Sequence, residues 1–339
     1  SFYLQAGGHG DMPESETDSF VVEFYAPADT VWNSVLNVKS NEVKGFQQFL
    51  IPVKQSKYLK KGFRFRFKNY ASLADDIPNL QIDADHWNLD YVYLDHKRSI
   101  DDTLINDVCF VKPLTSILRN YTSIPWNHFD DEVRDEEIET KISIVYQNLG
   151  NQIWNIPRYL AVRPLNGTGQ GGYKYGGAKN IGAFEIEDDY DFSLPYAYDV
   201  EAEDSAWFYL YSLIETDEDP DPKRTALRWN DTIQHTQKFN NYYAYDDGTA
   251  EMGYGLSGQG TRNARIAYRF ISYQEDTLQG VNICFNPPYN EVNRDVYFKL
   301  SLWNNINGKP GEIIYSKMKD SYKVEYGSAP NQFIFYEFD

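Results

Sequence analysis

The residues best suited to chemistry stand together in the stretch IDADHWNLDYVYLD, which runs from residue 82 to residue 95. It holds four aspartates, one histidine and one tryptophan. A histidine among carboxylates is the combination that general acid–base catalysis uses, and carboxylate oxygens are ligands for Ca²⁺. Either kind of site requires the side chains to converge on one pocket, so the outcome depends on the backbone that carries them.

The spacing of apolar residues in this stretch predicts a β-strand. Alternate residues of a strand share a face, so one face carries Trp87, Leu89, Tyr91 and Tyr93, and the other carries His86, Asn88, Asp90, Val92 and Leu94. Both faces are rich in apolar side chains, as a core requires. The remaining aspartates fall at the ends of the strand, where carboxylates accept hydrogen bonds from loop N–H groups: Asp83, Asp85 and Asp95. We expect a strand here, with a calcium or ligand site as the alternative.

No other motif in the chain supports catalysis. The pattern G-x-G-x-x-G occurs in GTGQGG and in GYGLSG, but no helix formers follow it, so both are expected to be flexible loops. The five histidines and two cysteines show no zinc-binding spacing, and no G-x-S-x-G elbow is present. Cys109 and Cys284 lie among apolar residues, which favours two buried free thiols. We therefore predict no catalytic residue and a protein that is not an enzyme.

Calcium is the one cofactor for which the sequence offers candidate ligands. Asp246, Asp247 and Glu251 bracket Gly248 in YDDGTAE and would bind Ca²⁺ if the turn brings their carboxylates together. The competing interpretation is that Asp-Gly marks an ordinary turn. The acidic runs at residues 130–139 and 215–221 lack the EF-hand order and are expected to be solvated turns.

The overall charge argues against two classes of partner. The chain has 339 residues and a formal net charge of -18. A protein must bring cations to neutralise phosphates, so neither nucleic acid nor an anionic membrane surface is an expected partner. No run of about 18 apolar residues occurs, which predicts no membrane insertion.

One basic island, KQSKYLKKGFRFRFK, interrupts this acidity at residues 54–68. We interpret it as a solvent-facing strand whose cations resist edge pairing with other chains. The alternative is a docking face for an acidic partner or for a neighbouring module.

The elements that must position these side chains are strands. GFRFRFKNY alternates strictly, with phenylalanines 63, 65 and 67 on one face and cations at 64, 66 and 68 on the other. Short runs of this kind between turn-forming residues predict an all-β chain of tandem β-sandwiches. We expect a jelly roll over residues 1–114, a connector plus an immunoglobulin-like (Ig-like) sandwich over 115–238, and a second jelly-roll-like sandwich over 239–339. Both ends of the chain look cut, and the last sandwich is expected to be truncated.

Several phrases of the sequence resemble one family. SFYLQAGGHGDMPESETDSFVVEFYAP, GFRFRFKNYASL and DHWNLDYVYLD are similar to the concanavalin-like or MAM-like jelly-roll module of large secreted proteins from Bacteroidota. PLTSILRNYTSIPWNHF resembles the segment that follows this module there, and YYAYDDGTAEMGYGLSGQGTRNARIAYRF resembles a second β-sandwich module. The resemblance covers most of the chain except roughly residues 150–230.

The resemblance implies a destination and a role. It implies export by the type IX route to the extracellular or outer-membrane surface, a sorting domain beyond residue 339, and no catalytic residues to carry over. We therefore expect a non-catalytic, adhesin-like protein with an adhesive or structural binding role and a protein or glycan partner at the cell surface. The alternatives are a carbohydrate-binding array of a larger hydrolase, or an accessory subunit docked on the outer-membrane secretion or gliding machinery.

Exported proteins of this phylum also resemble one another in carrying O-glycans at Asp-Ser/Thr followed by a small or aliphatic residue. This chain has five such triplets, whose hydroxyls belong to Thr30, Thr103, Ser205, Thr232 and Thr277. Average composition would give roughly one or two. The competing interpretation is that Asp-Thr and Asp-Ser are turn dipeptides.

Overall fold

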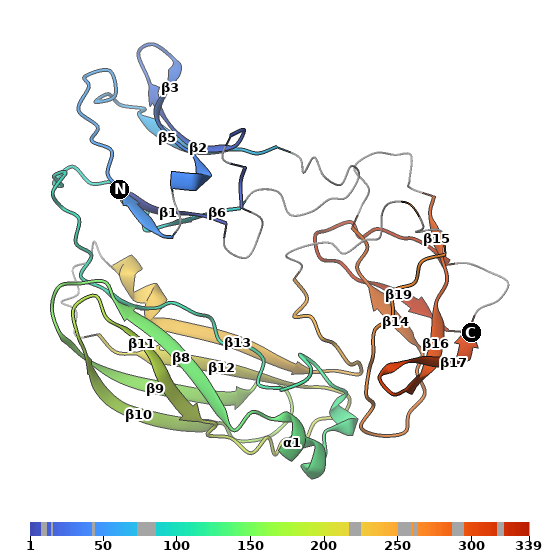
Figure 1. The fold of residues 1–339 in the computed structure, drawn as a ribbon. Coiled ribbons are helices and arrows are strands. Elements are labelled where there is room, and N and C mark those ends of the chain that lie inside the picture. Colours follow the sequence, from blue (N-terminus) through green and yellow to red (C-terminus); the bar gives the residue numbers. More distant parts are fainter. Residues whose placement is uncertain are drawn as a thin grey trace. The chain divides into compact units, whose positions relative to one another are not determined.

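The computed structural model describes all residues except 8–11, 15, 43–44, 73–85, 217–224, 250–258, 260–262, 287–294, 317–321 and 339. The described part is almost entirely β-structure, with one α-helix, as the sequence predicts for an all-β chain of sandwiches (Figure 1). The chain divides into two compact units. One holds residues 1–103, 249–269 and 277–339, and the other holds residues 104–248 and 270–276.

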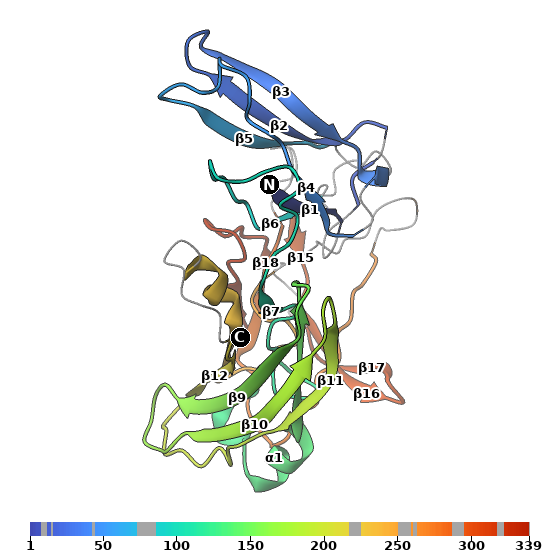
Figure 2. The same ribbon diagram turned by 90° about the vertical axis from the view of Figure 1, so that its left-hand side faces the viewer.

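The N-terminal sandwich of the first unit consists of two three-stranded antiparallel sheets, β4-β1-β6 and β3-β2-β5 (Figure 2). Their bounds are β1 Phe2–Ala6, β2 Ser19–Ala26, β3 Val31–Val38, β4 Gln47–Phe49, β5 Arg64–Tyr70 and β6 Trp87–Asp90, with a 3-10 turn at Ser40–Glu42. Alternation along β1 and β2 buries Leu4, Phe20 and Val22 in one core. The ring of Phe67 on β5 lies 5.2 Å from that of Phe2 and 5.6 Å from that of Phe20. Phe67 therefore lies on the core side of β5, as the predicted phenylalanine face requires.

Strand β6 is shorter than the sequence predicts. Trp87 packs against Phe20 with ring centroids 5.5 Å apart, and Leu89 pairs with Leu4 of β1. The ladder ends at Asp90 because Tyr91 adopts a φ of 48°, a left-handed conformation that a strand cannot continue through. The alternation expected as far as residue 94 is therefore wrong beyond residue 90.

The Ig-like sandwich of the second unit stacks a four-stranded sheet, β10-β9-β12-β13, on a three-stranded sheet, β11-β8-β7 (Figure 1). The bounds are β7 Val108–Phe110, β8 Lys141–Asn148, β9 Trp154–Pro164, β10 Gly172–Ile181, β11 Ile186–Ser193, β12 Ala206–Ile214 and β13 Thr232–Phe239. Strict alternation on β12 buries Phe208 and Leu210 between the sheets and turns Trp207, Tyr209 and Tyr211 outward. Both sheets contribute to one core, whose fully buried side chains include Tyr146 and Ile156.

This unit begins and ends at positions that differ from those predicted. Strand β7 pairs with β8 through Val108 and Asn148, so residues from 104 onward belong to the Ig-like sandwich and not to the preceding module. The expected connector also enters the core, where Ile117 and Ile124 are fully buried. It carries 3-10 turn η2 (Trp126–His128) and helix α1 (Asp131–Glu137), and a second 3-10 turn, η3 (Thr225–Asp231), precedes β13.

Residues 270–276 return to the Ig-like sandwich after a long excursion of the chain, and we call them the strap. The Tyr121 hydroxyl donates to the Ile271 carbonyl at 2.9 Å and accepts from the Ile271 N–H at 2.8 Å. The Tyr273 hydroxyl donates to the buried Glu137 carboxylate, and Nε2 of His128 lies 3.1 Å from Oδ2 of Asp276. The strap is thereby fixed to the residues around η2 and α1.

The described strands of residues 277–339 form three two-stranded antiparallel ladders, β14-β19, β15-β18 and β16-β17. Their bounds are β14 Gly280–Ile283, β15 Tyr297–Phe298, β16 Ser301–Ile306, β17 Lys309–Ser316, β18 Tyr322–Lys323 and β19 Ile334–Glu337. A cluster of rings around the buried Tyr336 joins Phe285, Phe298 and Tyr322. The second jelly-roll-like sandwich expected over residues 239–339 stays a prediction.

Candidate functional site

The acidic stretch that first suggested chemistry does not form a common pocket among the described residues. The backbone carbonyl of His86 accepts the N–H of Gly7, and the Asp90 carboxylate accepts the N–H of the next residue. The Asp95 carboxylate accepts from the N–H of Lys97 in the loop that follows β6, which has already ended at Asp90. Asp83 and Asp85 lie outside the described residues.

The predicted calcium ligands occupy an exposed turn. Asp246 and Asp247 are exposed, and the Asp246 carboxylate accepts the N–H of Gly248 at 3.0 Å. Glu251 lies outside the described residues. In the part of the chain that the structure describes, no three His, Cys, Asp or Glu side chains gather closely enough to hold a metal ion. The Ca²⁺ site stays a prediction.

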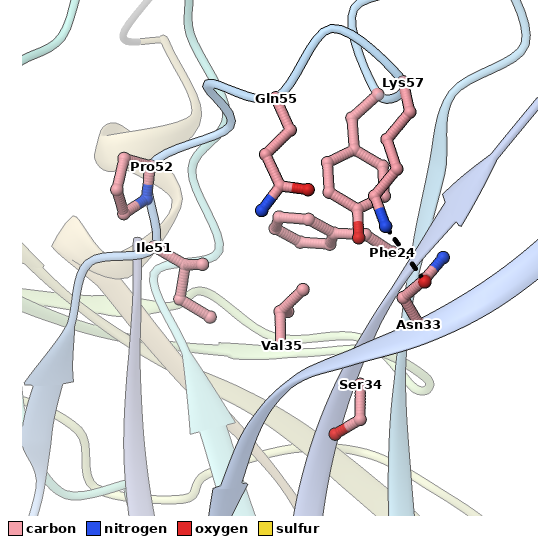
Figure 3. A pocket seen from close by; sticks show the side chains of 9 residues that line it. Phe24, Asn33, Ser34, Val35, Ile51, Pro52, Gln55 and Lys57 are labelled. Carbon is pink, nitrogen blue, oxygen red and sulfur yellow. Dashed lines mark hydrogen bonds between the residues drawn. The ribbon is translucent and has the colours of Figure 1, made fainter.

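A cavity of about 390 Å³ opens in the N-terminal sandwich (Figure 3). Its floor is apolar and its rim polar, and it is lined by Phe24, Asn33, Ser34, Val35, Ile51, Pro52, Gln55, Lys57 and Tyr58. The Lys57 ammonium donates to the Asn33 side-chain carbonyl at 3.0 Å, so the rim's cation already has a partner (Figure 3). The lining has room for a small polar molecule and contains no carboxylate or imidazole for acid–base work.

The cations that the basic island contributes to β5 lie on the outer face of the sheet β3-β2-β5. The Arg64 guanidinium lies 4.2 Å from the Tyr25 ring centroid, and that of Arg66 lies 4.2 Å from the Trp32 ring centroid. Arg66 also forms an ion pair with Glu23 at 2.6 Å, which lowers the pKa of this glutamate. The predicted solvent-facing strand is present, and a glutamate partly neutralises its cations.

The four-stranded sheet of the Ig-like sandwich carries a net positive charge, whereas the chain as a whole is negative. No aspartate or glutamate occurs within β9, β10, β12 or β13, whereas β9 and β10 each carry two cations and β13 carries one. The whole chain holds 50 acidic and 32 basic residues. This sheet is therefore a cationic layer in an acidic protein.

Aromatic side chains cover the outer surface of this sheet, which we call the aromatic face. It consists of Tyr159 and Arg163 on β9, Tyr173 and Tyr175 on β10, Trp207, Tyr209 and Tyr211 on β12, and Lys238 on β13. Backbone pairing brings them together, because Tyr175 lies opposite Tyr159, and Tyr209 opposite Arg163. Tyr173 is 61% exposed and Tyr175 53%, so the rings are open to solvent.

The rings of the aromatic face lie near one another at shallow angles. The Tyr159 ring is 5.9 Å from that of Tyr173 at 31°, and 5.2 Å from that of Tyr175 at 36°. The Tyr209 and Tyr211 rings are 5.7 Å apart at 33°. Neighbouring strands are about 4.8 Å apart and residues on one face of a strand repeat every ~6.8 Å. Tyr159 lies at the level of Leu213, three such repeats from Trp207, so the platform measures roughly 20 Å by 10 Å.

Two cations are seated on these rings. The Arg163 guanidinium is 5.3 Å from the Tyr209 centroid and 5.2 Å from the Tyr211 centroid. The Lys238 ammonium is 5.4 Å from the Trp207 centroid. Such contacts hold a long cationic side chain in place while leaving its charge available to a ligand.

Hydrogen bonds fix the polar ends of the rings. The Tyr159 hydroxyl donates to Glu215 at 3.0 Å, which raises the pKa of this phenol to about 12. The Tyr209 hydroxyl donates to Gln234, and the Trp207 indole N–H donates to Asn240 at 2.9 Å. The rings are thus oriented in advance, which reduces the entropy lost when a ligand binds.

Between the two sheets the sandwich buries several charges. Arg158 and Glu187 are each 5% exposed. The Arg158 guanidinium stacks 3.6 Å from the Tyr190 ring centroid and donates to the Gly176 carbonyl, while Glu187 pairs with Lys179. Burial also raises the pKa of Tyr146, which lies in the same layer. These groups connect strands of the two sheets.

A pair of buried carboxylates stands where two strands begin. Asp107 precedes β7 and Asp231 precedes β13, with 0% and 6% of their surfaces exposed. Burial, followed by the nearby Asp107 charge, raises the pKa of Asp231 to about 7. The Asp231 carboxylate accepts from Thr216, and that of Asp107 from Asn230.

The predicted glycan acceptors lie apart from the aromatic face or at its margin. Thr30, Thr103, Thr232 and Thr277 are exposed, and Ser205 is half-buried next to β12. Glycosylation itself stays a prediction.

The aromatic face was not among the predicted sites. Its signal in the sequence is the alternation WFYLYSL on β12 together with an absence of acidic residues over four strands. Which runs become neighbours is set by the pairing of β10 with β9 and of β9 with β12, so no single run shows the cluster.

No helix in the described part of the chain is long and apolar enough to cross a membrane. Comparison with family models, curated proteins and solved structures gave no match for this chain. The class of protein is therefore defined by the fold alone: an all-β protein built from β-sandwiches.

Proposed function

We propose that this chain is a non-catalytic, surface-displayed protein with an adhesive or structural binding role, exported by the type IX route. The observation that supports it best is the aromatic face, where six rings and two cations share the outer surface of one sheet and three of the rings are exposed. Tyr, Trp and Arg dominate the energetically important contacts of binding surfaces, and a sheet face holds them at fixed positions. The sequence resemblance to secreted proteins of Bacteroidota supplies the destination.

The test of display uses intact cells of the organism that produces the protein. Protease added outside should degrade the chain, and disabling the type IX machinery should leave it protected in the periplasm. A chain that resists outside protease in cells with intact machinery would contradict surface display.

The test of binding uses the purified, fluorescently labelled chain. The double variant Trp207→Ala/Tyr209→Ala should attach to producing cells or their matrix at least tenfold more weakly than the wild type, because two anchors are lost. Trp229→Ala is the matched control, since Trp229 is 84% exposed and lies outside the aromatic face. Equal attachment by all three proteins would remove the aromatic face from the proposal.

A second candidate function is an accessory subunit docked on outer-membrane secretion or gliding machinery. The observation that favours it is the outer face of β3-β2-β5, where Arg64 and Arg66 cover Tyr25 and Trp32. An acidic protein partner would bind there through the same cations. In that case Arg64→Glu/Arg66→Glu should abolish co-purification with one defined outer-membrane protein, while Arg163→Glu should preserve it.

A further inference from the structure

The aromatic face combines two properties that together specify a ligand, and this argument rests on the proposed binding function. The first property is charge. No acidic residue stands on any strand of the sheet, and the outward-facing Arg163 and Lys238 lie at its Trp207 end. In a chain with 50 acidic residues, this local absence makes the Trp207 end of the face positive, while Glu215, which accepts from the Tyr159 hydroxyl, follows β12 at the other end.

The second property is shape. The rings stand on adjacent paired strands, with neighbouring centroids 5.2 to 5.9 Å apart at angles of 31° to 36°, and the cavity of about 390 Å³ belongs to the N-terminal sandwich. Anchoring residues of a protein partner insert into pockets, which a surface of this kind does not offer. A flat ring surface instead suits a ligand that is itself flat and extended.

Sugar rings meet this requirement. The face of an aromatic ring carries partial negative charge and attracts the polarised C–H groups on the face of a sugar ring. The hydroxyls of Tyr173, Tyr175 and Tyr211, with the Gln234 amide beside Tyr209, can exchange hydrogen bonds with sugar hydroxyls. Nucleic-acid bases also stack on aromatic rings, but two outward cations are few for a phosphate backbone.

We propose that the aromatic face binds an acidic polysaccharide, whose chain lies across β10, β9 and β12 with its carboxylate or sulfate groups beside Arg163 and Lys238. The rings provide contact with the sugar faces, and the two cations select against neutral chains. Arg163 is held between Tyr209 and Tyr211, so it can donate to an anion without first being ordered.

The test is affinity electrophoresis of the purified full chain in native gels. The gels contain polygalacturonate, alginate, hyaluronate or heparin as acidic polysaccharides, dextran as a neutral polysaccharide, and polyglutamate as an anion without sugar rings. At least one acidic polysaccharide should retard the chain, whereas dextran and polyglutamate should not.

Variants then assign the binding to this face. For the acidic polysaccharide that binds, Trp207→Ala and Arg163→Gln should each raise the dissociation constant about tenfold. Arg66→Gln is the matched control, because Arg66 also covers a tryptophan but lies on the N-terminal sandwich, and it should leave the constant unchanged. Circular dichroism of each variant confirms that it is folded.

Each other outcome overturns the proposal in a distinct way. Retardation by no acidic polysaccharide, or equally by dextran, rejects an acidic glycan as the ligand. Equal retardation by polyglutamate shows a general anion surface, and an unchanged constant for Trp207→Ala places the site elsewhere. If the labelled chain binds cells through this face but loses its target after protease treatment of those cells, the ligand is a protein, and the binding function stands without the glycan.

Discussion

The two sheets of the Ig-like sandwich share one core and differ in almost everything that faces away from it. The sheet β10-β9-β12-β13 has no acidic residue, whereas β11 alone carries three exposed aspartates, Asp188, Asp189 and Asp191. Both sheets also contain a bulge, formed around Gly176 and Gly177 in one and around the two adjacent aspartates in the other. The core requires only that alternate residues be apolar, so the outward positions are free to differ.

This comparison teaches where selection for binding can act. The inward residues of both sheets are constrained by packing. The outward residues of one sheet include three exposed aspartates on β11, and those of the other are mostly aromatic and cationic. The predictions below test this division between inward and outward residues, beginning with the largest expected effect.

Two neighbouring residues of β12 provide the strongest test. Phe208→Ala should lower the free energy of unfolding by about 3–5 kcal/mol, because Phe208 is fully buried and its loss leaves a cavity. Trp207→Ala should cost about 1 kcal/mol or less, because Trp207 is 40% exposed on the outer face. Urea unfolding monitored by circular dichroism measures both. Similar losses for the two variants would contradict the division.

The carboxylate pair at the starts of β7 and β13 predicts a pH dependence. The folded protein binds the Asp231 proton more tightly than the unfolded chain, because the pKa of this group is raised to about 7. Its contribution to stability is therefore complete below about pH 4 and is lost as the pH rises through 7. As the pH rises through 7, the free energy of unfolding of the wild type should therefore fall by roughly 2–3 kcal/mol more than that of Asp231→Asn.

The measurement is urea unfolding of both proteins at intervals between about pH 2 and pH 8. Asp18→Asn is an informative comparison, because hydrogen bonds lower the pKa of Asp18 in the N-terminal sandwich. Its contribution has the opposite sign and is lost as the pH falls below about 4. Parallel pH profiles for wild type and Asp231→Asn would show that Asp231 does not titrate in this range.

The two arginines of β9 test the same division with charged residues. Arg158→Met should cost about 2 kcal/mol, because the buried guanidinium stacks on Tyr190 and donates to the Gly176 carbonyl. Arg163→Met should change stability by less than about 0.5 kcal/mol, since Arg163 is exposed. Thermal unfolding of the two variants measures both losses of stability. A larger loss for Arg163→Met than for Arg158→Met would contradict the division between inward and outward residues.

The smallest effect concerns the glycine bulge of β10. Gly177 has a φ of 75° with open space around its Cβ position, so Gly177→Ala should cost about 1 kcal/mol of backbone strain alone. Gly176→Ala should cost more, because the new Cβ would lie 2.5 Å from the Tyr190 hydroxyl. Gly45→Ala, with neither strain nor a close contact, is the control and should be neutral. Melting temperatures would show this order.

Local alternation predicted the strands but not their limits. It identified β5 and its two faces, because each residue's side is set by its parity in the strand. It failed beyond Asp90, where Tyr91 turns left-handed, and it took the run containing α1 for solvated turns. That run forms a helix because the Asp130 side chain accepts the N–H of Val133 as an N-cap, a contact that composition alone does not weigh.

The carboxylate pair and the aromatic face could not be predicted, because each is formed by residues that are far apart in the sequence. Asp107 and Asp231 come together because β7 and β13 begin near each other, although they lie far apart along the chain. The aromatic face requires β10, β9 and β12 to be neighbours, and their pairing follows the topology of the sandwich. The Asp95 carboxylate does accept a loop N–H, but β6 ends at Asp90, so the strand end predicted at residue 95 is wrong.

The strap carries a mechanical consequence. A pull on the chain beyond residue 276 reaches residues 270–276 before it reaches the excursion that follows β13. The bonds of Ile271 with Tyr121 and of Tyr273 with Glu137 must therefore break before tension is passed to the end of β13. Breaking this clip would lengthen the path of the chain between β13 and residue 277 while both sheets of the sandwich remain intact.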